Sequence, residues 1–378
     1  MAKALLPLRS SCSPLFSFCS PPPAAPSLRI PSFALLPPLL HVRHHHPEVL
    51  VHHCFLPLRS FPRLPLHRRA HGTRGSSDAV KNEKVLSIGF LGLGIMGTAM
   101  ARNLIKSGCQ WTLCSHDVMV WNRTANKCEV LVSEGAKLGS SPEQVAGSCD
   151  ITFAMLADPT AAKEVAWGKG GAVFGLGPEK GYVDVSTVDE ETSKAISERV
   201  KSSGALYLEA PVSGSKKPAE EGKLIFLTAG DKLLYERVCP LLNVMGKSRF
   251  YLGEVGNGAT MKLIVNMLMG SMMASLSEGL VLGSKVGLDP RTIIEVISEG
   301  AISAPMFSLK GPTMLKGDYE PAFPLKHQQK DLHLALALAE KVAQSTPVAA
   351  AANELYKLAK STGLGDKDFS AVIEAVKS

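Results

Sequence analysis

Two segments of this 378-residue chain combine residue types and spacings that could carry out chemistry. Gly92, Gly94 and Gly97 follow an apolar run and fit the pattern G-x-G-x-x-G, which binds a dinucleotide when it joins a strand to a helix. Lys262 and Asn266 are four residues apart and would share one face of a helix rich in Met and Leu. A lysine that points from such a helix into a cleft has a lowered pKa and can donate a proton. From spacing alone, a solvent-exposed lysine is an equal alternative.

The glycine segment predicts a phosphate cradle. Gly92 permits the tight turn, Gly94 lets the backbone approach a pyrophosphate, and Gly97 lets the helix pack closely on the strand. The start of that helix offers free N–H groups and a partial positive charge to the phosphates. The residues expected to contact the cofactor here are Gly92, Leu93, Gly94, Ile95, Met96 and Gly97. A glycine-rich turn without a ligand is the weaker alternative.

The second predicted strand ends at Asn122, Arg123 and Thr124, where this kind of fold distinguishes the two nicotinamide dinucleotides. An acidic side chain at this tip would repel a 2′-phosphate, and the tip has none. Arg123 can pair with the phosphate, and Asn122 and Thr124 can donate hydrogen bonds to it. We therefore expect NADP(H) rather than NAD(H). A solvated loop arginine is the alternative for Arg123.

The connection between the glycines and this tip is longer than usual, since Asn122 lies 30 residues after Gly92. The surplus coincides with Gln110–His116, directly after a predicted helix end. We interpret it as a surface loop insertion or as a splicing error in the gene sequence, because loops between a helix and a strand tolerate added length. A transcript that lacks these seven codons would decide between the two.

A second turn could bind an anion. Ser213 and Gly214 follow a predicted strand that ends at Glu209. The Ser213 hydroxyl and the Gly214 N–H could together form a pocket for a carboxylate. Spacing alone favours a simple turn of Pro, Gly and Ser.

Strand-like and helical segments alternate before Gly256, and only helical patterns follow it. Strands are expected at Val85–Leu91, Asp117–Trp121, Asp150–Met155, Tyr182–Val185, Leu206–Glu209, Leu224–Thr228 and Arg249–Tyr251. Helices are expected at Ile95–Ser107, Asp189–Ser202, Lys232–Asn243, Ala259–Val286, Pro290–Ser298, Lys326–Ala343 and Pro347–Ser361. We therefore predict an α/β fold. A Rossmann-like, doubly wound dinucleotide-binding domain would cover residues 84–255, and an all-α domain would cover residues 256–378.

The segment 263–283 is apolar enough to raise the question of a membrane span. Asn266 and Glu278 inside it, and the lack of asymmetry in basic flanking residues, favour a buried helix of a soluble protein. A long apolar helix also suggests that domains or subunits pack there, so we expect a homo-oligomer.

Residues 1–77 differ from the rest of the chain in composition. They hold nine of the 41 Lys and Arg residues, one of the 34 acidic residues and 13 of the 25 prolines. A segment rich in Arg and poor in acid is typical of an organelle transit peptide, which we expect to be disordered. The rest of the chain keeps 32 basic and 33 acidic residues, a net charge of −1. This balance argues against nucleic-acid binding.

Together, the motifs resemble those of the β-hydroxyacid dehydrogenase family. The resemblance rests on GFLGLGIMGTAMARNL from Gly89, EAPVSGS from Glu209 and G-x-G-x-x-x-K-x-x-x-N from Gly256. Within the family, the most similar members are the plant glyoxylate/succinic semialdehyde reductases, and the amino-terminal extension favours their organellar form. This closer similarity rests on FLGLGIMG, VWNRT, FAMLADP, YVDVSTV, APVSGSKKPA and FPLKHQQKD. It covers about residues 84–378, with the surplus loop as the interruption.

The resemblance implies roles for the matching residues. Lys262 would protonate the carbonyl oxygen, and Asn266 would help to hold the substrate and the lysine. Ser213 and Gly214 match the motif that binds the substrate carboxylate. The remaining matches are Leu156 on the adenosine side of the cofactor, Thr187 near its nicotinamide, Phe323 as an apolar wall, Lys330 touching the cofactor and Asp331 supporting the catalytic group.

The resemblance also implies an enzyme that uses NADPH to reduce glyoxylate to glycolate and succinic semialdehyde to 4-hydroxybutyrate. Two alternatives stay open: an NAD-dependent dehydrogenase of the 3-hydroxyisobutyrate type, and a non-catalytic scaffold that keeps the fold. The Asn-Arg-Thr tip argues against the first, and the presence of Lys262 argues against the second. We expect no metal, nucleic-acid or membrane partner, and a location in the chloroplast stroma or the mitochondrion.

Overall fold

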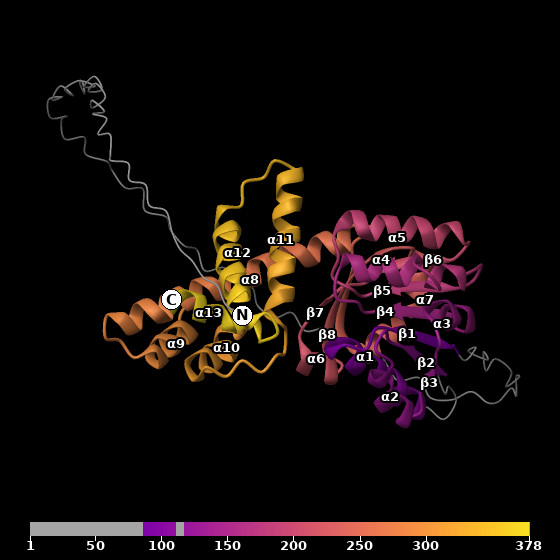
Figure 1. The fold of residues 1–378 in the computed structure, drawn as a ribbon, viewed down its shortest axis with the longest axis horizontal. Coiled ribbons are helices and arrows are strands. Elements are labelled where there is room, and N and C mark those ends of the chain that lie inside the picture. Colours follow the sequence, from indigo (N-terminus) through magenta and orange to yellow (C-terminus); the bar gives the residue numbers. More distant parts are fainter. Residues whose placement is uncertain (1–85, 111–116, 378) are drawn as a thin grey trace, which may run out of the picture. The chain divides into compact units, whose positions relative to one another are not determined.

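The computed structural model describes residues 86–110 and 117–377. Every strand of these residues lies between Ile88 and Tyr251, and the described chain from Asn257 onward is helical (Figure 1). The predicted fold class, a doubly wound α/β part followed by an all-α part, is therefore confirmed. The transit-peptide prediction for residues 1–77 lies outside the described residues.

The strands form one sheet in the spatial order β3-β2-β1-β4-β5-β6-β8-β7, and β9 pairs with β8. They are β1 (Ile88–Leu91), β2 (Val118–Trp121), β3 (Lys137–Leu138), β4 (Ile151–Ala154), β5 (Gly181–Asp184), β6 (Leu206–Glu209), β7 (Val212–Ser213), β8 (Leu224–Gly230) and β9 (Gly246–Tyr251). From β3 to β6 all neighbours are parallel, whereas β8 is antiparallel to both β6 and β7. The chain changes direction across the sheet between β1 and β4, and ligands of such folds bind beyond the carboxyl ends of the strands at this point.

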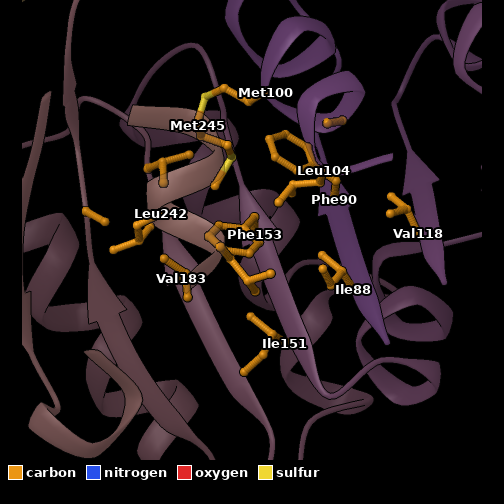
Figure 2. Close-up of a cluster of buried hydrophobic side chains, with 14 of the residues drawn as sticks. Ile88, Phe90, Met100, Leu104, Val118, Ile151, Phe153, Val183, Leu242 and Met245 are labelled. Atoms are coloured by element: carbon orange, nitrogen blue, oxygen red, sulfur yellow. The ribbon is translucent and has the colours of Figure 1, made fainter. Parts of the chain in front are cut away.

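Alternate residues of the parallel strands enter two separate cores, as expected for a sheet covered on both faces. Ile88, Phe90, Ile151, Phe153 and Val183 belong to the first core, which Figure 2 shows with side chains of α1 and α7 against them. The second core forms on the opposite face, against α3, α4 and α5. The sheet therefore holds its strand ends between two packed layers.

The helices of the α/β part begin at clear sequence signals. They are α1 (Ile95–Gln110), α2 (Glu129–Ser133), α3 (Pro142–Ser148), α4 (Pro159–Trp167), α5 (Glu190–Ser202), α6 (Lys216–Glu220) and α7 (Lys232–Met245), with short turns at Ala125–Cys128 and Ala172–Phe174. Ser141, Asp158, Asp189 and Asp231 cap α3, α4, α5 and α7 by accepting a hydrogen bond from a first-turn N–H group. Helix α1 extends to Gln110, and residues 111–116 of the surplus loop lie outside the described residues.

The helical part has its own core, which includes Met273, Leu280, Leu332 and Tyr356. Its helices are α8 (Asn257–Lys285), α9 (Pro290–Glu299), α10 (Pro305–Lys316), α11 (Leu325–Lys341), α12 (Pro347–Ala359) and α13 (Ile373–Lys377), with short turns at Lys360–Leu364 and Phe369–Val372. Helix α8 is long and apolar enough to cross a membrane by length and composition. However, α11 and α12 pack against it, and its buried residues include Lys262 and Asn266. Packing against α11 and α12 therefore buries part of this helix.

Candidate functional site

The glycine segment forms the turn from β1 into α1. Gly92 has a φ of +93°, and a Cβ there would lie 2.3 Å from the Met155 carbonyl oxygen. A Cβ at Gly97 would lie 2.0 Å from the Gly92 carbonyl oxygen, so the helix and the turn touch here. At Gly94, in contrast, a Cβ would meet no atom within 4 Å. The backbone is therefore open at Gly94, where the dinucleotide fold requires a pyrophosphate to approach.

The remaining residues of this turn are Leu93, Ile95 and Met96. Leu93 is buried, whereas Ile95, the first residue of α1, is 39% exposed. The N–H groups of a first helical turn have no partner within the helix and can bind an anion. With the open side at Gly94, these residues fit a bound dinucleotide phosphate.

The tip of β2 holds the glycine turn in place. The Asn122 Oδ1 accepts a hydrogen bond from the Leu93 N–H at 3.0 Å, and its Nδ2 donates to the Thr124 carbonyl at 2.9 Å. Donation from Asn122 to a 2′-phosphate, as expected from the sequence, would therefore use its second amide hydrogen. Arg123 extends into solvent with 77% of its side chain exposed, and its Nη1 lies 3.7 Å from the Glu164 Oε2. This guanidinium is accessible to a phosphate.

Two further predicted cofactor contacts, Leu156 and Thr187, follow the ends of β4 and β5. Leu156 follows β4, and its Cδ2 would lie 3.0 Å from a Cβ at Gly92, which places it beside the glycine turn. Its N–H donates to the Ser186 Oγ at 2.9 Å. Asp184 at the end of β5 accepts from the Ser186 N–H at 2.9 Å, and burial raises the pKa of Asp184 to about 6. Hydrogen bonds to Ser186 thus fix the two strand ends against each other.

The candidate catalytic residues form a chain of hydrogen bonds between α8 and α11. The Lys262 Nζ donates to the Asn266 Oδ1 at 2.9 Å, and the Asn266 Nδ2 donates to the Asp331 Oδ2 at 2.6 Å. The other Asp331 oxygen lies 2.7 Å from the Lys330 Nζ, which also donates to the Thr187 carbonyl at 2.7 Å. The predicted residues Lys262, Asn266, Lys330, Asp331 and Thr187 therefore lie in one connected network.

Burial makes the Lys262 amine a better proton donor. The side chain is 6% exposed, and loss of hydration lowers its pKa from 10.5 to about 8. The negative charge of Asp331 opposes this shift, and the positive charge of Lys330 adds to it. A general acid works best when its pKa lies near the working pH, because it then carries the proton and still releases it readily. At neutral pH the Lys262 amine is therefore protonated, and it releases its proton more readily than an ordinary lysine does.

The predicted carboxylate motif lies on the antiparallel edge of the sheet. Ser213 ends β7 and pairs with Ile225 of β8. Gly214 follows with a φ of +138°, and a Cβ there would lie 2.7 Å from the Leu224 Cδ2, so the turn requires glycine. Ser213 is partly exposed and can reach a ligand.

Phe323 lies in the helical part, with its ring 5.7 Å from that of Phe369 and 6.4 Å from that of His327. Its N–H donates to the Asp368 Oδ2 at 3.2 Å, and the other Asp368 oxygen is 2.8 Å from the Lys310 Nζ. Both partners of this ion pair are buried. It fixes the segment that presents Phe323, the predicted apolar wall.

Sequence reasoning left two residues at this site without a role. The Gln328 Nε2 donates to the Asn266 carbonyl at 2.9 Å and ties α11 to α8. Glu209 is 2% exposed and accepts hydrogen bonds from the Gly256 and Gly258 N–H groups at the start of α8. A carboxylate at the end of a buried strand was the available signal for Glu209. Its partners, however, lie 47 and 49 positions further along the chain.

Comparison with known proteins matches both parts of the chain to dehydrogenases. Residues 87–253 match the family model for the NAD-binding domain of 6-phosphogluconate dehydrogenase. Residues 256–376 match the family model described as NAD-binding of NADP-dependent 3-hydroxyisobutyrate dehydrogenase. The fold resembles that of a 3-hydroxyisobutyrate dehydrogenase from Salmonella typhimurium, with a TM-score of 0.69, 24% identity and coverage of 76% of this chain and 99% of that one.

Curated relatives extend the match over most of the chain. The chloroplastic glyoxylate/succinic semialdehyde reductase 2 of Arabidopsis thaliana is 63% identical over 324 residues, covering 85% of this chain and 88% of that protein. Glyoxylate/succinic semialdehyde reductase 1 of the same plant is 57% identical over 292 residues, covering 77% and 99%. The human cytokine-like nuclear factor N-PAC is 46% identical over 288 residues, which are 76% of this chain and 51% of that protein. The chain thus belongs to the β-hydroxyacid dehydrogenase family, as its motifs predicted, and is an oxidoreductase with an NAD(P)-binding domain.

Proposed function

We propose that this protein reduces short aldehyde acids with NADPH, converting glyoxylate to glycolate and succinic semialdehyde to 4-hydroxybutyrate. The observation that carries the proposal is the buried Lys262 amine with a pKa of about 8, hydrogen bonded to Asn266. The two plant relatives that bear this activity in their names match the chain at 63% and 57% identity.

The chemistry follows from the positions of the residues. When bound, the dinucleotide supplies a hydride to the aldehyde carbon. Negative charge then grows on the carbonyl oxygen, and the protonated Lys262 stabilises that charge and transfers a proton to it. Asn266 holds the amine, and Asp331 holds Asn266, so the proton donor has a fixed direction. The product is an alcohol, and the lysine regains its proton from solvent.

Binding of the substrate is assigned to the turn at Ser213 and Gly214. Its hydroxyl and N–H groups would bind the carboxylate that both aldehyde acids share. Fixing the carboxylate orients the aldehyde for reaction, and Phe323 would close the apolar side. A neutral aldehyde without a carboxylate would lose this contact and bind more weakly.

For the cofactor, the preference for NADPH is part of the proposal. It is supported by the exposed Arg123 and by the lack of a carboxylate among the three tip residues of β2. The guanidinium pairs with Glu164, and both side chains are more than half exposed, so solvent screens this pair and a phosphate can replace it.

The organisation of the whole chain completes the proposal. We assign residues 1–77 to a transit peptide for the chloroplast and residues 84–255 to a cofactor-binding domain. Residues 256–378 would form a domain that binds the substrate and mediates self-association. The chloroplast is favoured over the mitochondrion by the chloroplastic relative. Self-association is supported by apolar side chains exposed along α8, at Met261, Ile264, Leu268 and Leu282. Light scattering of the purified protein would measure the number of chains.

The proposed activity is tested by NADPH oxidation with glyoxylate and with succinic semialdehyde, for the wild type and for Lys262→Ala. Turnover by the wild type, with loss of turnover but not of NADPH binding in the variant, is expected. Turnover only with NAD and 3-hydroxyisobutyrate would instead establish the alternative dehydrogenase. Cofactor binding without turnover on any of these substrates would favour a scaffold.

A further inference from the structure

Glu209 joins the end of β6 to the start of the helix that carries the candidate proton donor. Its Oε1 accepts the Gly256 N–H at 2.8 Å and the Gly258 N–H at 2.7 Å. Its Oε2 accepts from the Ser193 hydroxyl. Because Ser193 uses its hydrogen for Glu209, the Tyr207 hydroxyl must donate to Ser193, at 3.0 Å. Both carboxylate oxygens are therefore bound within the protein.

The two glycines are shaped for this contact. Gly256 precedes α8 with a φ of +106°, a conformation that turns its N–H toward the carboxylate and that other residues rarely adopt. A Cβ at Gly258 would lie 2.5 Å from the Leu227 carbonyl oxygen and 3.0 Å from the Glu209 Oε1. Only glycine lets the first turn of α8 approach both groups. Both glycines of the G-x-G in the lysine motif thus donate their N–H groups to a carboxylate of the protein.

The same residue also begins the predicted carboxylate motif. Glu209 ends β6, and Ser213 and Gly214 follow within five residues. Lys262 lies one helical turn after Gly258 on the helix that Glu209 holds. A regular helix moves as a unit, so a shift of its first turn displaces the Lys262 amine relative to the turn at Ser213.

We propose that Glu209 is a positioning residue of the reaction, which sets the place of Lys262 relative to the substrate carboxylate by anchoring the first turn of α8. It does not touch the substrate or the cofactor. It acts through the Gly256 and Gly258 N–H groups, and Ser193 holds it in the orientation that this requires. The inference rests on the proposed function for its effect on turnover, but the anchoring itself is measurable without turnover.

The test compares three variants in the full chain. Glu209→Ala removes the anchor. Glu209→Gln keeps an oxygen for the two N–H groups and an amide that can donate to a reoriented Ser193 hydroxyl. The matched control is Asp231→Asn, which alters the carboxylate that caps α7, a helix without predicted site residues. All three lose one carboxylate charge, but only the first loses the anchor of α8.

Glu209→Ala should lower kcat by about 10- to 100-fold, the range for displacement of a catalytic group by up to about 1 Å. Its Kd for NADPH should stay within about 2-fold of the wild-type value, because the cofactor binds at the glycine turn and the substitution changes only the position of Lys262. Glu209→Gln should recover most of the lost kcat. Asp231→Asn should keep kcat within about 2-fold, since surface caps away from a site mainly change stability. A kcat of Glu209→Ala equal to that of the control would overturn the proposal.

Hydrogen exchange at the Gly256 and Gly258 amides gives the readout that does not depend on turnover. Both amides should exchange faster in Glu209→Ala than in the wild type, and not in Asp231→Asn. If the wild type reduces no aldehyde acid, the proposed function fails, yet unchanged exchange in Glu209→Ala would still refute the anchor. If Glu209→Ala does not fold, Ser193→Ala replaces it, because it leaves the carboxylate in place but removes the group that orients it.

Discussion

Replacing Lys262 with methionine should make the protein inactive and more stable. The amine is buried, and its pKa of about 8 instead of 10.5 measures what burial costs the protonated form. At about 1.4 kcal/mol per pKa unit, that cost is roughly 3 kcal/mol. Methionine has a similar length and no charge, so the cost disappears. Loss of the hydrogen bond to Asn266 destabilises the variant by about 1 kcal/mol, so its free energy of unfolding should rise by about 2 kcal/mol in total.

The gain should depend on pH in a defined direction. Below about pH 8 the lysine is protonated in both the folded and the unfolded chain, so the full difference from Lys262→Met is present. Between about 8 and 10.5 the unfolded chain binds more protons than the folded chain, so the wild type becomes more stable as the pH rises. The advantage of the variant therefore shrinks over this range.

Urea denaturation at about pH 7 and about pH 9.5 measures both effects, with Lys285→Met as the control. Lys285 is exposed at the end of the same helix, so its replacement should change stability by no more than about 0.5 kcal/mol. Turnover of Lys262→Met should fall by about 100- to 10,000-fold, the usual contribution of a general acid. Two results would refute the argument that burial of the charged amine destabilises the fold. One is a Lys262→Met variant no more stable than the wild type, and the other is an equal gain in unfolding free energy at the two pH values.

Three further outcomes are expected from the same site and its supports. The kcat/KM for aldehyde reduction should fall as the pH rises through about 8, because Lys262 loses its proton, and in Asp331→Asn the fall should begin at lower pH, because the charge that raises the pKa is gone. A pH profile that is flat to pH 10 contradicts this. Arg123→Ala should raise the KM for NADPH by about 10-fold or more, through loss of a charged hydrogen bond, and leave the KM for NADH unchanged; equal effects on both cofactors would count against the selectivity. Asp368→Asn should cost about 3–5 kcal/mol of unfolding free energy, because Lys310 would stay buried without its partner, and a thermal or urea melt that shows less than about 1 kcal/mol would contradict this.

The longer strands and most of the long helices could be predicted from sequence because each has a local hydrophobic pattern. All seven predicted strands are present, with bounds that differ by a few residues. Strands β3 and β7 were missed, since two residues are too short to show a hydrophobic period. The expected helices also left out α2, α3, α4, α6 and α13, which are nine residues long or shorter, and the longer α10, which has Gly311 and Pro312 inside it. Gly311 packs tightly against Ile294 there, so tertiary contact compensates for poor helix propensity.

The contacts of the candidate site also differ in whether the local sequence could predict them. The four-residue spacing of Lys262 and Asn266 predicted that they share one helix face, and in the structure the lysine donates to the amide oxygen at 2.9 Å. Asp331 lies 65 positions from Asn266, so only the resemblance to a family could bring it into the site. Glu209 has no spacing signal at all, because its partners belong to another part of the fold. Contacts that depend on tertiary packing leave no local pattern in the sequence.

The amide of Asn122 has a consequence for how the cofactor preference could change over evolution. An aspartate in its place would keep an oxygen for the Leu93 N–H, so the glycine turn would retain its shape while the new charge repelled a 2′-phosphate. The donor to the Thr124 carbonyl would be lost, but that bond is exposed. A single base change can convert an asparagine codon to an aspartate codon. This tip therefore offers a short mutational path from one nicotinamide dinucleotide to the other that does not pass through a misfolded intermediate.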